Sequence, residues 1–255
     1  MPILVFCLAG YNPGLIPSTV LRTRIVLAGA AGLAVVIASA DRMRDVLQLS
    51  GSYLPKAAGL FGIVLAILVA RIDVHHPFAR LGPAIVTTLA RALMVSLVAA
   101  FIGEPLRADV AWVAAILALV ITLLDGVDGW LARRTRMASD FGARFDMEVD
   151  ALLIMALAIL VWQHGKAGVW VLLSGLIRYA FVAAGWLLRW LARPLPASRR
   201  RQTVCVVQVG GLNLALVPAI PPPAATIVSA VALAALVWSF FVDVRWLSRR
   251  AHDRV

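Results

Sequence analysis

Eight apolar runs occupy most of the 255-residue chain and constrain its fold more than any other feature. They cover residues 25–40, 57–72, 84–103, 110–132, 147–163, 168–188, 203–220 and 224–243. A helix needs about 20 apolar residues to cross the hydrocarbon core of a bilayer, so the last six runs predict membrane-spanning helices. The first two runs are shorter, and they fit tilted, interfacial or re-entrant helices as well as spanning ones.

Proline and glycine separate the later runs where loops are expected, for example at Gly82-Pro83 and at Pro221-Pro222-Pro223. No internal repeat is visible. The pattern predicts an all-α integral membrane protein with a six-transmembrane-helix core and one or two additional N-terminal apolar helices. The expected domains are an N-terminal apolar addition at 1–80, a membrane domain at 81–245 and a basic cytoplasmic tail at 246–255.

Composition points to lipid as the solvent for most of the surface. Hydrophobic residues make up 62% of the chain, and a soluble protein with that share would expose large apolar patches. The 24 Lys and Arg residues against 13 Asp and Glu give a net charge of +11. The basic residues cluster between the apolar runs, where they set topology and attract anionic lipid, so nucleic acid is not an expected partner.

The basic residues also predict the orientation of the six-helix core. Thirteen arginines fall on one side, at 133, 134, 136, 144, 189, 193, 199, 200, 201, 245, 249, 250 and 254. The opposite loops of the core hold only Arg107 and Lys166. Positive residues stay in the cytoplasm, so both core termini and the loop 133–145 are predicted to be cytoplasmic. Arg-rich, Lys-poor usage is typical of a bacterial protein, which suggests the bacterial inner membrane.

Six of the 13 acidic residues fall within residues 125–150. Asp125 and Asp128 are three residues apart near the end of one apolar run. Asp146 and Asp150 are four apart at the start of the next run. These spacings place side chains on one face of a helix, and a short loop makes the two helices antiparallel neighbours. Four carboxylates are therefore predicted to converge in one polar pocket at the membrane surface.

Such a cluster predicts a bound cation, because like charges repel and a carboxylate at the bilayer centre costs about 2.5–3.5 kcal/mol. Carboxylate oxygens are hard ligands and no His or Cys is nearby, so Mg²⁺, Mn²⁺ or Ca²⁺ fits better than zinc. Four carboxylates could hold two ions, and paired divalent ions suit phosphoryl transfer. The alternative is that the Asp residues cap helices or pair with nearby arginines, which is the usual role of a single Asp at a helix end.

Small residues beside the carboxylates also suggest a ligand pocket. Gly129, Ala132 and Gly142 would let a flat base and a diphosphate approach the backbone, and Arg133 could pair with a phosphate. A glycine inside a helix costs about 1 kcal/mol relative to alanine, so its presence near the acidic pair favours a role in binding.

Together these residues resemble the signature of the CDP-alcohol phosphotransferases, also called CDP-alcohol phosphatidyltransferases. The signature is Asp, two residues, Asp-Gly, two residues, Ala-Arg, about eight residues, Gly, three residues, Asp, three residues, Asp. Its fixed positions are filled here by Asp125, Asp128, Gly129, Ala132, Arg133, Gly142, Asp146 and Asp150. In the family's first core helix, Thr88 and Arg91 match a common pattern, whereas Ile85 stands where an Asn is expected.

The resemblance implies a metal-dependent enzyme that transfers a substituted phosphate from a CDP-alcohol to an acceptor hydroxyl and releases CMP. It implies a homodimer whose site opens to the cytoplasm and the bilayer. Asp125, Asp128 and Asp146 would bind Mg²⁺ or Mn²⁺, as two ions. Asp150 would be the general base and a further metal contact. The residues that would line the CDP site are Gly129, Ala132, Arg133 and Gly142.

The substrates follow less directly from the sequence. The resemblance and the bacterial composition favour CDP-diacylglycerol as donor, with a role in phospholipid biosynthesis. Ala151 stands where many phosphatidylglycerophosphate synthases carry Lys, which counts against glycerol 3-phosphate as acceptor. Arg178, Arg200 and Arg201 are candidates for contact with an anionic acceptor or a lipid headgroup, although Arg178 could instead pair with an acidic neighbour and the basic run 199–201 could serve topology.

Three alternatives stay open. A soluble CDP-alcohol could be the donor and a lipid the acceptor. A cation transporter also carries membrane Asp residues, but it would place them near the midplane, often in inverted repeats. A catalytically inactive scaffold would be expected to have lost a signature carboxylate.

Overall fold

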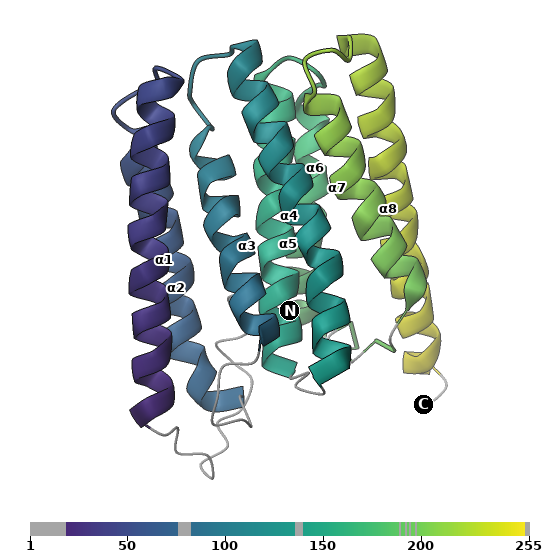
Figure 1. Cartoon of the computed structure of the whole chain (residues 1–255). Coiled ribbons are helices and arrows are strands. Elements are labelled where there is room, and N and C mark those ends of the chain that lie inside the picture. Colours follow the sequence, from purple (N-terminus) through teal and green to yellow (C-terminus); the bar gives the residue numbers. More distant parts are fainter. Residues whose placement is uncertain are drawn as a thin grey trace. The chain divides into compact units, whose positions relative to one another are not determined.

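The apolar runs fold into helices in the computed structural model, which describes residues 19–75, 83–135, 140–188, 190–191, 193, 195–196 and 198–252. No strand occurs in these ranges. The α-helices, labelled in Figure 1, are α1 (Thr19–Val46), α2 (Tyr53–His75), α3 (Pro83–Ala100), α4 (Ala108–Thr135), α5 (Asp140–Gln163), α6 (Leu173–Leu187), α7 (Arg199–Leu216) and α8 (Pro222–His252). A short 3-10 helix, η1 (Val169–Leu172), directly precedes α6.

Five segments of the described chain are long and apolar enough to cross a membrane. They are Ile25–Val46, Tyr53–Ala70, Ala108–Gly126, Val169–Leu187 and Pro222–Arg250, and Val86–Ala100 is a shorter apolar helix. Large apolar side chains on these helices are exposed, including Leu27, Ile63 and Phe241. Side chains of this kind are stable against lipid rather than water, so the prediction of an all-α integral membrane protein is confirmed.

The first two apolar runs form longer helices than their apolar length suggested. Helix α1 has 28 residues because it continues beyond the apolar run through polar residues that pair along the helix, such as Asp41 with Arg44 at 2.9 Å. Helix α2 has 23 residues. Both helices contain a segment that is long enough to span a bilayer, so length does not restrict either of them to the membrane surface.

The chain divides into two compact units between Leu153 and Ile154, inside α5. In the first unit, α1 lies beside α2, both contact α3, and α3 packs on α4 (Figure 1). A Cβ atom at Gly32 of α1 would lie 2.8 Å from the Phe61 ring of α2. The lack of a side chain at this position lets the two helices approach closely, as small residues do between membrane helices.

The second unit contains the rest of α5 together with η1, α6, α7 and α8. Its principal contact joins α7 and α8, which lie side by side (Figure 1). Gly211 of α7 faces Ala232 of α8, and a Cβ atom at Gly211 would lie 2.9 Å from the Ala232 side chain. At the other end of this pair, Arg200 of α7 donates to the Ser239 carbonyl oxygen at 2.7 Å and forms an ion pair with Asp243.

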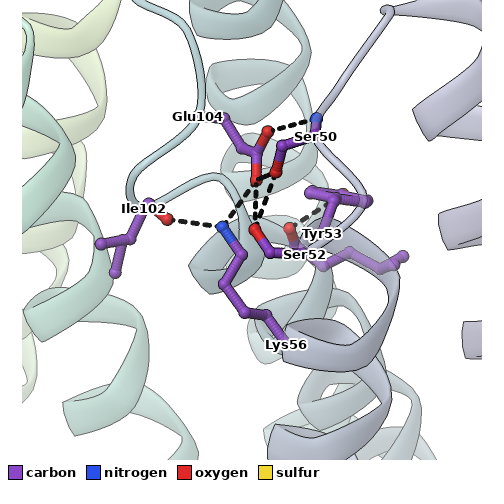
Figure 2. A network of polar contacts seen from close by, with 7 residues as sticks. Ser50, Ser52, Tyr53, Lys56, Ile102 and Glu104 are labelled. Atoms are coloured by element: carbon purple, nitrogen blue, oxygen red, sulfur yellow. Dashed lines mark hydrogen bonds and ion pairs between the residues drawn. The ribbon is translucent and has the colours of Figure 1, made fainter.

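A polar network joins the α1–α2 loop to the α3–α4 loop within the first unit (Figure 2). The Glu104 side chain has no exposed surface. Its Oε1 accepts from Lys56 Nζ at 2.6 Å, and its Oε2 accepts from the Ser50 backbone N–H at 2.8 Å. Lys56 Nζ also donates to the Ile102 carbonyl oxygen at 2.8 Å, and the Tyr53 hydroxyl donates to the Leu97 carbonyl oxygen at 3.1 Å. The network therefore ties the N-terminal helices to α3.

Replacement of Glu104 by Gln is expected to lower the free energy of unfolding by about 2 kcal/mol, because it removes charge-assisted hydrogen bonds to a buried group. Thermal unfolding of the purified protein in lipid nanodiscs measures the change. The control is Asp109→Asn, whose partner Arg107 and own side chain are both exposed, so the variant should unfold like the wild type. Equal unfolding temperatures for Glu104→Gln and the control would contradict the structural role of the network.

The difference in stability between the wild type and Glu104→Gln is also expected to depend on pH. Burial alone would raise the pKa of Glu104, but the hydrogen bonds from Lys56 and Ser50 and the charge of Lys56 outweigh it and hold the pKa below its usual value. A carboxyl group with a lowered pKa in the folded state stabilises the protein above its unfolded pKa and loses that contribution as the pH falls through the folded pKa. The stability difference between wild type and Glu104→Gln should therefore be constant above about pH 5 and shrink below it.

Candidate active site

The candidate site lies in the first unit, where α3, α4 and α5 each contribute charged side chains. Asp125 is in the C-terminal part of α4, one residue before the end of the candidate membrane span Ala108–Gly126. Asp146 and Asp150 lie one turn apart near the start of α5, which explains why their side chains share one helical face. Arg91 is in the middle of α3. The four residues come from three helices and meet at one place.

Three carboxylates converge in this site. One oxygen from each of Asp125, Asp146 and Asp150 lies within 4.8 Å of the others. Their side chains are partly accessible, with exposed fractions of 33%, 32% and 21% respectively. Three of the four carboxylates that were predicted to converge are thus close together, and the cluster can be reached from outside the protein. The convergence of Asp128 stays a prediction, because its side chain is not among those described.

Arg91 lies among the three carboxylates with a side chain that is only 1% exposed. Its Nη1 is 2.8 Å from Asp125 Oδ1 and also contacts Asp146 Oδ1, and its Nη2 contacts Asp150 Oδ1. A guanidinium group presents its donors in a fixed planar fork, which lets one side chain serve several carboxylates. Thr88, one turn earlier on α3, is also buried.

The geometry of the carboxylates suits a divalent cation. Two oxygens that share one Ca²⁺ are at most about 5 Å apart, and two that share one Mg²⁺ are at most about 4.2 Å apart. The 4.8 Å limit on the three oxygens meets the condition for Ca²⁺ and leaves at most about 0.6 Å of closure for Mg²⁺. All three ligands are hard oxygen donors, which favours Mg²⁺, Mn²⁺ or Ca²⁺ over softer metals.

Several predicted site residues lie outside the described side chains. Asp128, Gly129, Ala132 and Arg133 belong to α4, but the described side chains of that helix end at Gly126. Gly142 is partly buried in the first turn of α5, on the same helix as Asp146 and Asp150. The predicted CDP-binding role of these small residues and of Arg133 therefore stays a prediction.

The three arginines predicted near an acceptor or headgroup belong to the second unit. Arg178 is in α6 and partly buried. Arg200 and Arg201 lie in the first turn of α7, and both pair with Asp243 of α8, Arg201 at 3.3 Å. The Arg200 guanidinium also lies 5.6 Å from the centre of the Trp238 ring. These contacts give the two α7 arginines a structural partner in addition to any ligand.

The position of Arg91 among the carboxylates is the part of the site that the sequence did not predict. A signal for it was present, because an arginine within an apolar run of a membrane helix marks a functional site by default. Arg91 interrupts the run 84–103 in the same way that Arg178 interrupts 168–188. Its partners on α4 and α5 were identified only by the three-dimensional arrangement of these helices.

Comparison with known proteins gives one positive finding. The sequence profile of the CDP-alcohol phosphatidyltransferase family matches residues 80–244, which is well over half of the chain and includes Arg91 and all three clustered carboxylates. No curated protein and no solved structure matches the chain significantly.

Proposed function

The chain belongs to the CDP-alcohol phosphatidyltransferase family, and from that premise we propose that it transfers a phosphatidyl group from CDP-diacylglycerol to an acceptor alcohol, with release of CMP. Members of the family are divalent-metal-dependent transferases that use a CDP-alcohol donor and an alcohol acceptor. The observation that carries the proposal is the convergence of Asp125, Asp146 and Asp150 inside the region that matches the family.

One or two Mg²⁺ or Mn²⁺ ions are proposed to be held by Asp125 and Asp146. Asp128 is proposed as a further ligand, because it follows Asp125 by three residues on α4. Bound there, the metal would neutralise the charge of the diphosphate and of the departing CMP. Gly129, Ala132, Arg133 and Gly142 are proposed to line the CDP site, because small residues allow close approach to the backbone and Arg133 can pair with a phosphate oxygen.

Asp150 is proposed to accept the proton of the acceptor hydroxyl, and it also lies within reach of the metal ligands. The acceptor oxygen then bonds to the phosphorus that carries the lipid. The bond between that phosphorus and the bridging oxygen breaks, and the bridging oxygen leaves with CMP. The proton held by Asp150 is released to solvent, since the side chain is 21% exposed, and the base is regenerated.

The proposed setting is a cytoplasmic membrane of a bacterium, with the site facing the cytoplasm and the chain acting as a homodimer in phospholipid biosynthesis. The basic residues beside the site and at the start of α7 support this orientation. It predicts that cysteines introduced at Ser198 and Pro221, at opposite ends of α7, label from opposite sides of the membrane.

An anionic acceptor or headgroup is proposed to contact Arg178, Arg200 and Arg201.

The test of the function is CMP release by the purified protein in nanodiscs. CDP-diacylglycerol, CDP-choline and CDP-ethanolamine would be supplied separately, each with a mixture of soluble and lipid alcohols and with Mg²⁺. Release is expected with CDP-diacylglycerol alone and is expected to stop in excess chelator. Release only with a soluble CDP-alcohol would overturn the donor assignment, and no release with any donor would overturn the proposed reaction.

A further inference from the structure

Arg91 brings a fixed positive charge to the place where a divalent cation would bind. Its guanidinium contacts one Oδ1 atom on each of Asp125, Asp146 and Asp150. The same three carboxylates form the group whose oxygens could hold a metal ion. A guanidinium and a metal ion would therefore compete for the same ligand set.

We propose that Arg91 is a built-in counter-ion, a positioning residue that holds the three carboxylates together without metal and lowers their affinity for the divalent cation. The proposal rests on the metal site of the proposed function. Three carboxylates within 4.8 Å of one another repel strongly unless a cation lies between them. Arginine suits this role because it stays protonated and its planar fork can serve several acceptors.

Burial makes the charge of Arg91 effective at this position. Its side chain is 1% exposed, so water and salt screen it far less than they screen the exposed arginines of the chain. The same charge must repel an incoming divalent cation. Binding of the metal has to draw at least one carboxylate away from the guanidinium, so the cation affinity of the site is set by an exchange rather than by the carboxylates alone.

The test compares Arg91→Met with the wild type in nanodiscs, without any CDP-alcohol. Met has a similar length but no charge. In chelator, the apparent unfolding temperature of the variant is expected to fall by about 10 °C, because carboxylates packed beside it lose their counter-ion. Calorimetric titration with Mg²⁺ is expected to show an affinity higher by about tenfold or more, because the repelling charge is gone. Saturating Mg²⁺ should recover most of the lost unfolding temperature.

The matched control is Arg44→Met, which removes a surface arginine of α1 that pairs with the exposed Asp41 of the same helix. It should change neither the unfolding temperature in chelator nor the affinity for Mg²⁺. Arg91→Lys keeps the charge but offers a single ammonium group to three carboxylates. Its Mg²⁺ affinity should stay within about threefold of the wild type, while its unfolding temperature in chelator falls part of the way.

The outcomes separate this proposal from the proposed function. The counter-ion role alone would be overturned if the wild type binds Mg²⁺ and releases CMP, while Arg91→Met shows unchanged stability in chelator and unchanged or weaker Mg²⁺ binding. A wild type that binds no divalent cation would overturn both the exchange and the metal-dependent reaction. If Arg91→Met does not fold even in Mg²⁺, Arg91→Lys decides, and a tenfold rise in its Mg²⁺ affinity would overturn the proposal.

Discussion

An Asp146→Asn variant is expected to release CMP about 10³-fold more slowly than the wild type, or slower still, at saturating donor and Mg²⁺. Asn keeps the shape of the side chain but removes the negative charge that would hold the divalent cation. Asp146 lies between the other two carboxylates in the network, since it shares the Nη1 group of Arg91 with Asp125 and lies one helical turn from Asp150. Its loss therefore weakens both the metal site and the placement of its neighbours.

The stability of Asp146→Asn should not fall with its rate of CMP release. This difference distinguishes a loss of function from misfolding. Removal of one of three mutually repelling carboxylates still leaves Arg91 paired with Asp125 and Asp150. The unfolding temperature of Asp146→Asn in chelator is thus expected to equal or exceed that of the wild type, as is common for residues that serve activity rather than stability. Addition of Mg²⁺ should raise it less than it raises the wild type.

The control for Asp146→Asn is Asp41→Asn, which alters an exposed carboxylate on α1 that pairs with Arg44. It should retain full CMP release and the full response to Mg²⁺. Unchanged CMP release by Asp146→Asn, or an unchanged rise in unfolding temperature on addition of Mg²⁺, would show that this carboxylate is not a metal ligand.

The helices of this protein were largely predictable because membrane-spanning segments carry a strong local signal. Seven of the eight apolar runs correspond to one α-helix each, and the run 168–188 corresponds to η1 followed by α6. Among the described breaks, Gly165 lies between α5 and η1 and Pro221 lies directly before α8. The ends of α1 were less predictable, because the helix continues beyond the apolar run 25–40 at both ends, at the C-terminal end through polar residues such as Asp41 and Arg44. The contact between Lys56 and Glu104 could not be predicted, since it joins the start of α2 to a loop residue 48 positions later and depends on how α2 packs against α3.

In the candidate site, local sequence spacing predicted the carboxylates but not the partners of Arg91. The shared face of Asp146 and Asp150 follows from their four-residue spacing, and the short connection between α4 and α5 makes the approach of Asp125 predictable. Arg91 precedes Asp125 by 34 residues in the chain, and no periodicity relates the two. Its partners depend on the rotation of α3 about its own axis, which is set by packing against α2 and α4 rather than by any local pattern.

Asp150 is the carboxylate from which the second large effect is expected. It is the least exposed of the three, at 21% against 32% for Asp146 and 33% for Asp125. A general base must lie beside the acceptor hydroxyl and close to the reacting phosphate. Asp150 meets this condition if the metal and diphosphate bind at Asp125 and Asp146, because its oxygen lies within 4.8 Å of theirs.

Replacement of Asp150 by Asn is expected to lower the rate of CMP release at saturating substrate by about 10²–10⁴-fold, the usual contribution of a positioned base. An amide cannot accept the proton of the acceptor hydroxyl, but it preserves the size of the side chain and one hydrogen-bond contact with Arg91. Affinity for CMP should consequently stay within about threefold of the wild type, so that kcat falls while nucleotide binding persists. Mg²⁺ affinity should fall less than in Asp146→Asn, because the other two carboxylates of the cluster remain. A loss of CMP affinity with an unchanged rate would make Asp150 a nucleotide-binding residue. A loss of Mg²⁺ affinity as large as that of Asp146→Asn would make it chiefly a metal ligand, and the base would then have to be sought elsewhere on α3, α4 or α5.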